Sequence, residues 1–224
     1  GALSGLPCQA LNRAGGAGPV EQKDAATETG APPYLLWIGL SACGSILLLS
    51  VTNYLTQDVA SIPFLWILPL GVYLLTFVLC FDSDRVYRRR LFFQFAAIAI
   101  AATGYLLAQS KSMPNVVFTV TFLVLSLFVW CMVCHGELAR LKPAPRRLTA
   151  YYMTISAGGA VGGVFVGLIA PVAFNGYYEF PAGLAFAAVL MAVMVWRDDL
   201  SRQRRFRPGP AVLLVVTFAL LALG

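Results

Sequence analysis

Charged side chains are scarce in this sequence. Asp, Glu, Lys and Arg make up 12% of its 224 residues, whereas an ordinary soluble domain carries about 25%. Hydrophobic residues make up 59%, so the chain has too little polar surface to cover a globule in water. Five cysteines are too few, and odd in number, for a disulfide-stapled secreted module. The composition excludes a soluble domain, a disordered chain and a disulfide scaffold, and it predicts a polytopic membrane protein.

Seven apolar runs lack Asp, Glu, Lys and Arg, and each is interpreted as a membrane span, which needs about 20 residues; the last run is cut short by the end of the chain. They are residues 35–55, 62–81, 91–109, 116–134, 148–174, 181–196 and 210–223. Their hydrophobicity does not alternate as in a membrane barrel, and helices satisfy backbone polar groups inside lipid. The predicted fold class is therefore all-α, a helical membrane bundle over residues 34–224 with about seven transmembrane helices, the last of them truncated.

The basic residues are concentrated in the loops on one side of the predicted membrane. Of 16 Lys and Arg side chains, all but Lys111 fall in segments that alternation of the spans places on one side. The positive-inside rule makes that side cytoplasmic. This topology accounts for the basic loops without a nucleic-acid partner. Residues 1–33, rich in Gly, Ala, Pro, Glu and Thr, are interpreted as a flexible cytoplasmic linker, and both ends of the chain suggest a piece of a longer protein.

The string CMVCH, residues 131–135, matches the pattern of covalent haem attachment. The predicted topology places it at the cytoplasmic end of the fourth span, whereas haem is attached on the opposite face of bacterial membranes. Haem at Cys131, Cys134 and His135 is therefore not expected, and neither is another cofactor or a metal ion. A disulfide between the two cysteines is not expected either, because they face the reducing side.

His135 and Glu137 are ionisable residues at a predicted membrane boundary, where such groups are costly and often functional. One interpretation is a proton-accepting or amine-binding pair that faces the cytoplasm. The alternative is an interfacial helix end, with Gly136 as its C-terminal cap and His135 beside the negative end of the helix dipole.

A second polar cluster is predicted on the non-cytoplasmic side. Asn53 and Gln57 are four residues apart and share a helix face, Asp58 follows in the turn, and Glu179 lies on the same side of the membrane. Carboxylates and neighbouring aromatic rings could bind a cationic polyamine. The alternative is that Asp58 caps the next helix and that the aromatic residues form an interfacial belt.

The fifth predicted span carries overlapping G-x-x-x-G pairs. The glycines are Gly158, Gly159, Gly162, Gly163 and Gly167. Without Cβ atoms these positions let a neighbouring helix approach closely, so they are interpreted as a helix-packing seam. The partner helix could belong to this chain, to a second copy or to another membrane subunit.

Three segments of the chain resemble a family of bacterial membrane proteins described as fused major-facilitator/spermidine-synthase proteins. They are SVTNYLTQDVASIPFLWILPLGVYLLTFVLCF (residues 50–81), CHGELARLKPAPRRLTAYY (134–152) and GGAVGGVFVGLIAPVAFNGYYE (158–179). The resemblance implies a soluble aminopropyltransferase-like domain after the last span, and this chain itself has no catalytic motif of that kind. It further implies a non-catalytic membrane module that anchors the synthase-like domain and binds or moves polyamine. The alternative is a scaffold subunit that packs through the glycine-rich helix.

Overall fold

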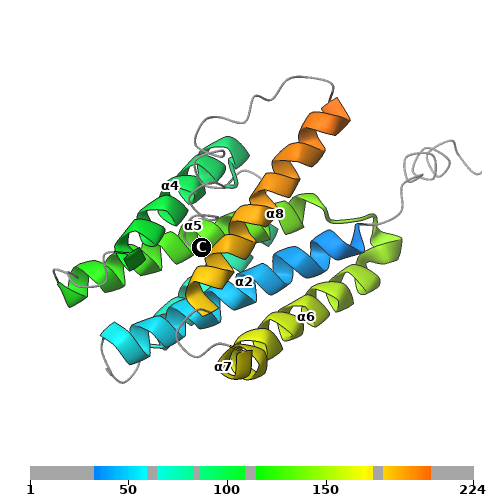
Figure 1. The fold of residues 1–224 in the computed structure, drawn as a ribbon. Coiled ribbons are helices and arrows are strands. Elements are labelled where there is room, and N and C mark those ends of the chain that lie inside the picture. The colour runs from blue at the N-terminus through cyan, green and yellow to red at the C-terminus, as the bar shows by residue number, and fades with distance from the viewer. Residues whose placement is uncertain (1–32, 60–64, 83–85, 109–114, 174–178, 203–224) are drawn as a thin grey trace, which may run out of the picture. The chain divides into compact units, whose positions relative to one another are not determined.

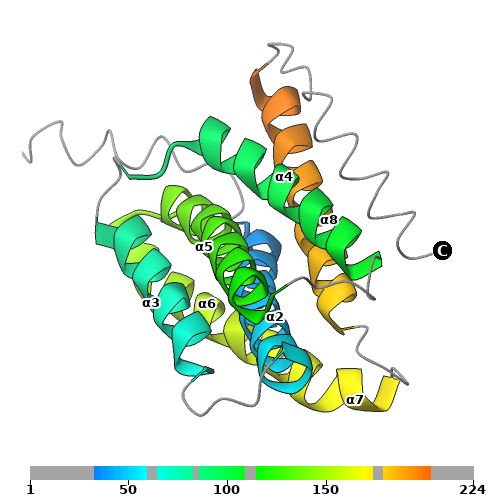
Figure 2. The same cartoon turned by 90° about the vertical axis from the view of Figure 1, so that its left-hand side faces the viewer.

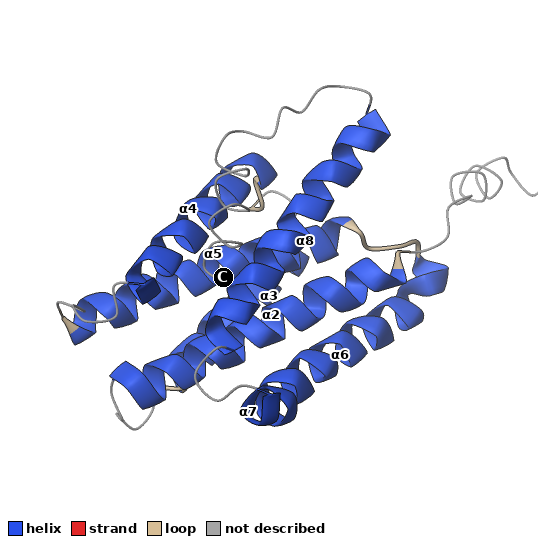
Figure 3. Cartoon of the chain, in the orientation of Figure 1, coloured by secondary structure: helices blue, strands red, loops and turns tan. Residues whose placement is uncertain are grey.

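The computed structural model describes residues 33–59, 65–82, 86–108, 115–173 and 179–202, and every regular element in these ranges is helical (Figure 3). The α-helices are α2 (Tyr34–Tyr54), α3 (Ile67–Asp82), α4 (Arg89–Ala108), α5 (Val116–Arg140), α6 (Leu148–Val164), α7 (Ala170–Ala173) and α8 (Glu179–Arg202). A π-helical turn, Leu55–Val59, extends α2, and a second one, Phe165–Ile169, joins α6 to α7. The predicted all-α fold class is confirmed.

Among the described residues, five helical stretches are long and apolar enough to cross a membrane. They are Tyr34–Gln57, Arg89–Leu107, Val116–Arg140, Pro145–Ala173 and Glu179–Arg197. The second predicted span, 62–81, corresponds to the shorter apolar helix Ile67–Asp82, and the seventh, 210–223, lies outside the described residues. The structure thus contains the helices of a membrane bundle, five of them of full spanning length.

Helices α2 and α5 form the centre of the described bundle (Figures 1 and 2). Helix α2 contacts α5, α6 and α8, while α5 also packs between α3 and α4. Their buried faces meet in one core that includes Trp37, Leu47, Leu127 and Trp130. The outer faces carry many exposed large hydrophobic side chains, on α3, α4 and α6 among others. Such apolar outer surface is typical of a lipid-facing bundle, because a soluble monomer rarely exposes it in large patches.

Helices α2 and α6 lie side by side and run in the same direction. A Cβ added at Gly158 would lie 2.7 Å from the Ile38 carbonyl oxygen, and one at Gly162 would lie 2.6 Å from that of Ala42. Both glycines therefore let the two backbones touch. The two contacts are four residues apart in each helix and come in the same order, so the helices run parallel. The Ser41 hydroxyl adds a hydrogen bond from α2 to a backbone carbonyl of α6.

The glycines of α6 and of the π-helical turn after it do not all face α2. A Cβ at Gly159 would lie 3.3 Å from the Ser45 hydroxyl of α2, whereas Cβ atoms at Gly163 and Gly167 would meet nothing within 4 Å. The closest helix packing thus occurs within this chain, through Gly158, Gly159 and Gly162.

The C-terminal end of α5 differs from the sequence-based expectation. The helix does not stop at the predicted boundary, residue 134, but continues to Arg140, where the Leu141 N–H bonds to the carbonyl oxygens of Glu137 and Leu138. The interpretation of Gly136 as a C-terminal cap is therefore wrong. The extra turn and a half is stabilised by tertiary contacts, among them a 2.7 Å hydrogen bond from the Tyr151 hydroxyl to the Leu138 carbonyl oxygen.

Candidate functional site

The Glu137 carboxylate lies near the end of α5 and is only 4% exposed. Its Oε1 atom forms ion pairs with Arg89 Nε at 2.9 Å and with Arg140 Nη1 at 3.1 Å. It also accepts a hydrogen bond of 3.0 Å from the Tyr87 hydroxyl. Three donors therefore meet at one oxygen atom. One comes from the segment before α4, one is the first residue of α4, and one is the last residue of α5. These four residues are called the Glu137 cluster below.

Tyr87 is placed by a close contact with α5. A Cβ added at Gly136 would lie 2.5 Å from the Tyr87 ring, so only glycine leaves room for the ring at this position. Burial first, and then the Glu137 carboxylate, raise the pKa of the Tyr87 phenol above its ordinary value. The phenol accordingly remains protonated and serves as a hydrogen-bond donor to Glu137.

Arg89 connects the Glu137 cluster to α8. Its Nη2 atom donates to the Met194 carbonyl oxygen at 3.5 Å, and its guanidinium lies 4.9 Å from the centre of the Phe93 ring. This side chain thus contacts groups of α4, α5 and α8 together. Because Glu137 already faces two guanidinium groups, the cluster offers no net negative charge to a cationic amine.

His135 is buried in the middle of the bundle, with 1% of its surface exposed. Its Nδ1 atom lies 3.0 Å from the Thr76 hydroxyl, which also donates to the Tyr73 carbonyl oxygen at 2.8 Å. Since that bond uses the hydroxyl proton, we infer that Nδ1 carries the imidazole hydrogen and donates to Thr76. The Tyr73 and Phe77 rings lie edge-on to the imidazole at 4.7 and 5.3 Å. Its Nε2 atom faces α2 at Gly44.

The polar residues predicted on the non-cytoplasmic side lie near the opposite end of α2. The Ser50 hydroxyl donates to the Glu179 carbonyl oxygen at 3.3 Å, which brings the start of α8 against the last turns of α2. Asn53 is partly buried and Gln57 is exposed, while Asp58 belongs to the π-helical turn and its side chain lies outside the description. The structure thus gathers Asn53, Gln57 and Glu179 at one end, away from Glu137. No hydrogen bond or ion pair joins their side chains in the described part of the chain.

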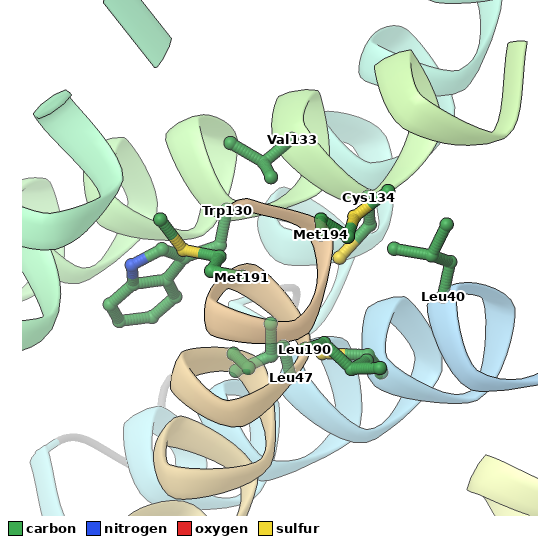
Figure 4. Close-up of a pocket in the computed structure, with 10 residues that line it drawn as sticks. Leu40, Leu47, Trp130, Val133, Cys134, Leu190, Met191 and Met194 are labelled. Atoms are coloured by element: carbon green, nitrogen blue, oxygen red, sulfur yellow. The ribbon is translucent and has the colours of Figure 1, made fainter. Parts of the chain in front are cut away.

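Cys131 and Cys134 of the CMVCH string are both buried in α5. Cys134 lines a small cavity between α2, α5 and α8 (Figure 4), whose lining is almost entirely apolar and sulfur-bearing. The cavity has room for little more than one water-sized particle. Within the described ranges, no group of three or more His, Cys, Asp or Glu side chains is arranged to hold a metal ion.

Sequence reasoning missed Tyr87, Arg89 and Thr76 as partners of the candidate residues. Arg89 was counted only among the cations that set the topology, and Thr76 lies inside an apolar run. One signal was present: an acidic residue near a membrane boundary requires a cationic or hydrogen-bonding partner. That requirement does not identify the partner, which lies about 50 residues away in sequence.

Comparisons of the chain with protein-family models, with curated proteins and with solved structures give no match. The function is therefore inferred from the side-chain contacts and from the resemblance of the three segments.

Proposed function

We propose that this chain is a non-catalytic integral membrane module of a spermidine-synthase-like protein, and that it anchors a synthase-like domain at the bacterial inner membrane. The observation that carries this proposal is the Glu137 cluster. Its ionisable side chains pair with one another between α4 and α5, and Arg89 also donates to a backbone carbonyl of α8. Groups used in this way stabilise a fixed arrangement of helices, which is what an anchor requires.

The distribution of charge supports a cytoplasmic position for the Glu137 cluster. It lies at the ends of α4 and α5 that adjoin basic segments, including Arg88, Arg90, Arg146 and Arg147. The positive-inside rule places such segments in the cytoplasm. A synthase-like domain that uses S-adenosyl chemistry would work on that side, so the ordered end of the bundle would face it.

Polyamine binding is a second proposed property, at the other end of the bundle. Asn53, Gln57 and Glu179 lie at the same end of the bundle, and Asp58 follows Gln57 in the chain. Glu179 is partly buried and, unlike Glu137, it has no ion pair in the described part of the chain, so its carboxylate is the proposed charge partner of a cationic amine. The amide groups of Asn53 and Gln57 would accept hydrogen bonds from the same ligand.

Liposomes that contain the purified chain test both properties. We expect the chain to remain in the membrane fraction after an alkaline carbonate wash, and spermidine accumulation to equal that of empty liposomes. Calorimetry should show saturable spermidine binding that Glu179→Gln weakens about two- to fivefold, as for the loss of one exposed ion pair. Asp82→Asn is the matched control, because this exposed carboxylate lies at the opposite end, at the end of α3.

Each result that disagrees removes a defined part of the proposal. Release by the alkaline wash would refute an integral membrane anchor. Saturable, time-dependent uptake of spermidine would replace the anchor by a transporter. Equal binding by wild type and Glu179→Gln would refute the polyamine site and leave the anchor in place.

A further inference from the structure

Four sulfur-bearing side chains line the cavity between α2, α5 and α8 (Figure 4). They are Cys43 of α2 and three residues that Figure 4 labels, Cys134 of α5 and Met191 and Met194 of α8. All four are between 1% and 6% exposed. The two cysteines line the cavity from α2 and α5 and the two methionines from α8, so sulfur-bearing side chains of three helices meet at one small space.

This set of side chains has a specific coordination chemistry. Thiolate and thioether sulfur are soft ligands that select Cu(I), whereas Mg²⁺, Ca²⁺ and Mn²⁺ prefer oxygen. The other lining side chains are hydrocarbon apart from the Trp130 indole. A hard cation would therefore find no oxygen ligand in this cavity.

We propose that the cavity binds one Cu(I) ion through the thiols of Cys43 and Cys134, with Met191 and Met194 as additional thioether ligands. Binding replaces the proton of one thiol: Cu⁺ and two R–SH groups give a Cu(SR)(HSR) complex and release one H⁺. The copper stays Cu(I) throughout, so no oxidant or reductant takes part. The complex carries no net charge, which keeps the cost of burial low. A divalent ion bound in the same way would retain a positive charge in an apolar surrounding.

The size of the cavity fits a single ion and is too small for a polyamine. The site uses only one cysteine of the CMVCH string, because Cys131 is not among the lining residues. Its partner, Cys43, lies about 90 residues earlier in the chain, so the spacing in the sequence could not reveal the pair. The proposed site is independent of the anchoring function.

The test is copper binding by the purified, reduced chain under anaerobic conditions. Cu(I) is supplied in a bathocuproine disulfonate buffer, and bound copper is measured by mass spectrometry together with ultraviolet thiolate-to-Cu(I) absorption. We expect one copper per chain in the wild type. Cys43→Ser and Cys134→Ser should each weaken binding about 100-fold or more, because removal of even an outer partner of a metal ligand costs 10–100-fold. Met191→Leu and Met194→Leu should weaken it less.

Cys80→Ser is the matched control, since Cys80 is also buried but its thiol lies 3.6 Å from the Met132 sulfur, outside the cavity. This variant should bind copper as the wild type does. X-ray absorption of the loaded wild type should show sulfur neighbours only, which keeps the proposal testable if a serine variant fails to fold. Failure of the wild type to take Cu(I) from the buffer would overturn the site. So would oxygen or nitrogen neighbours, or an equal loss of copper in Cys80→Ser.

Discussion

Replacing Glu137 by alanine is expected to lower the free energy of unfolding by about 3–5 kcal/mol, the usual cost of removing one partner of a buried ion pair. The variant leaves Arg89, whose side chain is 22% exposed, without the carboxylate that it faces at 2.9 Å. It also removes the acceptor of the Tyr87 hydroxyl. Unfolding of the purified chain by denaturant in mixed micelles, followed by circular dichroism, measures the change.

Arg140→Ala is the matched control for Glu137→Ala. The Arg140 side chain is 49% exposed, so removal of its ion pair should cost about 0–1 kcal/mol. The double variant Arg89→Met/Glu137→Met should recover much of the loss, because apolar residues of similar volume can replace a buried pair at little cost. Equal effects of Glu137→Ala and Arg140→Ala would contradict the central place of Glu137 in the cluster.

Replacing Gly158 by alanine is expected to destabilise the packing of α6 on α2 by about 1–3 kcal/mol, the typical cost of overpacking. The new Cβ would lie 2.7 Å from the Ile38 carbonyl oxygen and 2.9 Å from its Cα atom. Both are backbone atoms, so no side-chain rotation relieves the contact and the helices must separate. The same unfolding measurement reports the effect.

Gly163→Ala is the control on the same helix, because its Cβ would meet nothing within 4 Å. It should be neutral or slightly stabilising, since alanine favours the helix over glycine by about 1 kcal/mol. Equal destabilisation by both variants would contradict the assignment of the effect to the contact between Gly158 and Ile38, because the Gly163 position has no such contact.

Within the described ranges, the apolar runs were sufficient to predict where helices form, because a lipid-facing helix must be apolar over its length. The ends were harder to predict. Helix α5 extends to Arg140 because Glu137 and Leu138 are held by partners from distant segments. The ionisable and polar residues beyond position 134 are of the kind found where a membrane helix ends. Only the tertiary contacts make them part of the helix.

The sequence was sufficient to predict several residues of the candidate site, but not which residues they contact. The sequence drew attention to His135 and Glu137, yet two residues apart in one helix they contact different neighbours, Thr76 in one case and Arg89 in the other. The G-x-x-x-G pattern predicted close packing but could not identify α2 as the partner of Gly158. Such pairings depend on the three-dimensional arrangement of the helices, which local spacing does not encode.

The membrane topology is tested most directly by labelling two exposed positions with a membrane-impermeant maleimide. Ala144→Cys lies between α5 and α6, and Gln57→Cys lies beyond the far end of α2; both positions are exposed. Cys8 is replaced by serine in both variants, and the buried native cysteines Cys43, Cys80, Cys131 and Cys134 serve as the unlabelled background. Intact spheroplasts should label Gln57→Cys alone, and inverted vesicles Ala144→Cys alone. Labelling of both positions from the same side would contradict a membrane module with its Glu137 cluster in the cytoplasm.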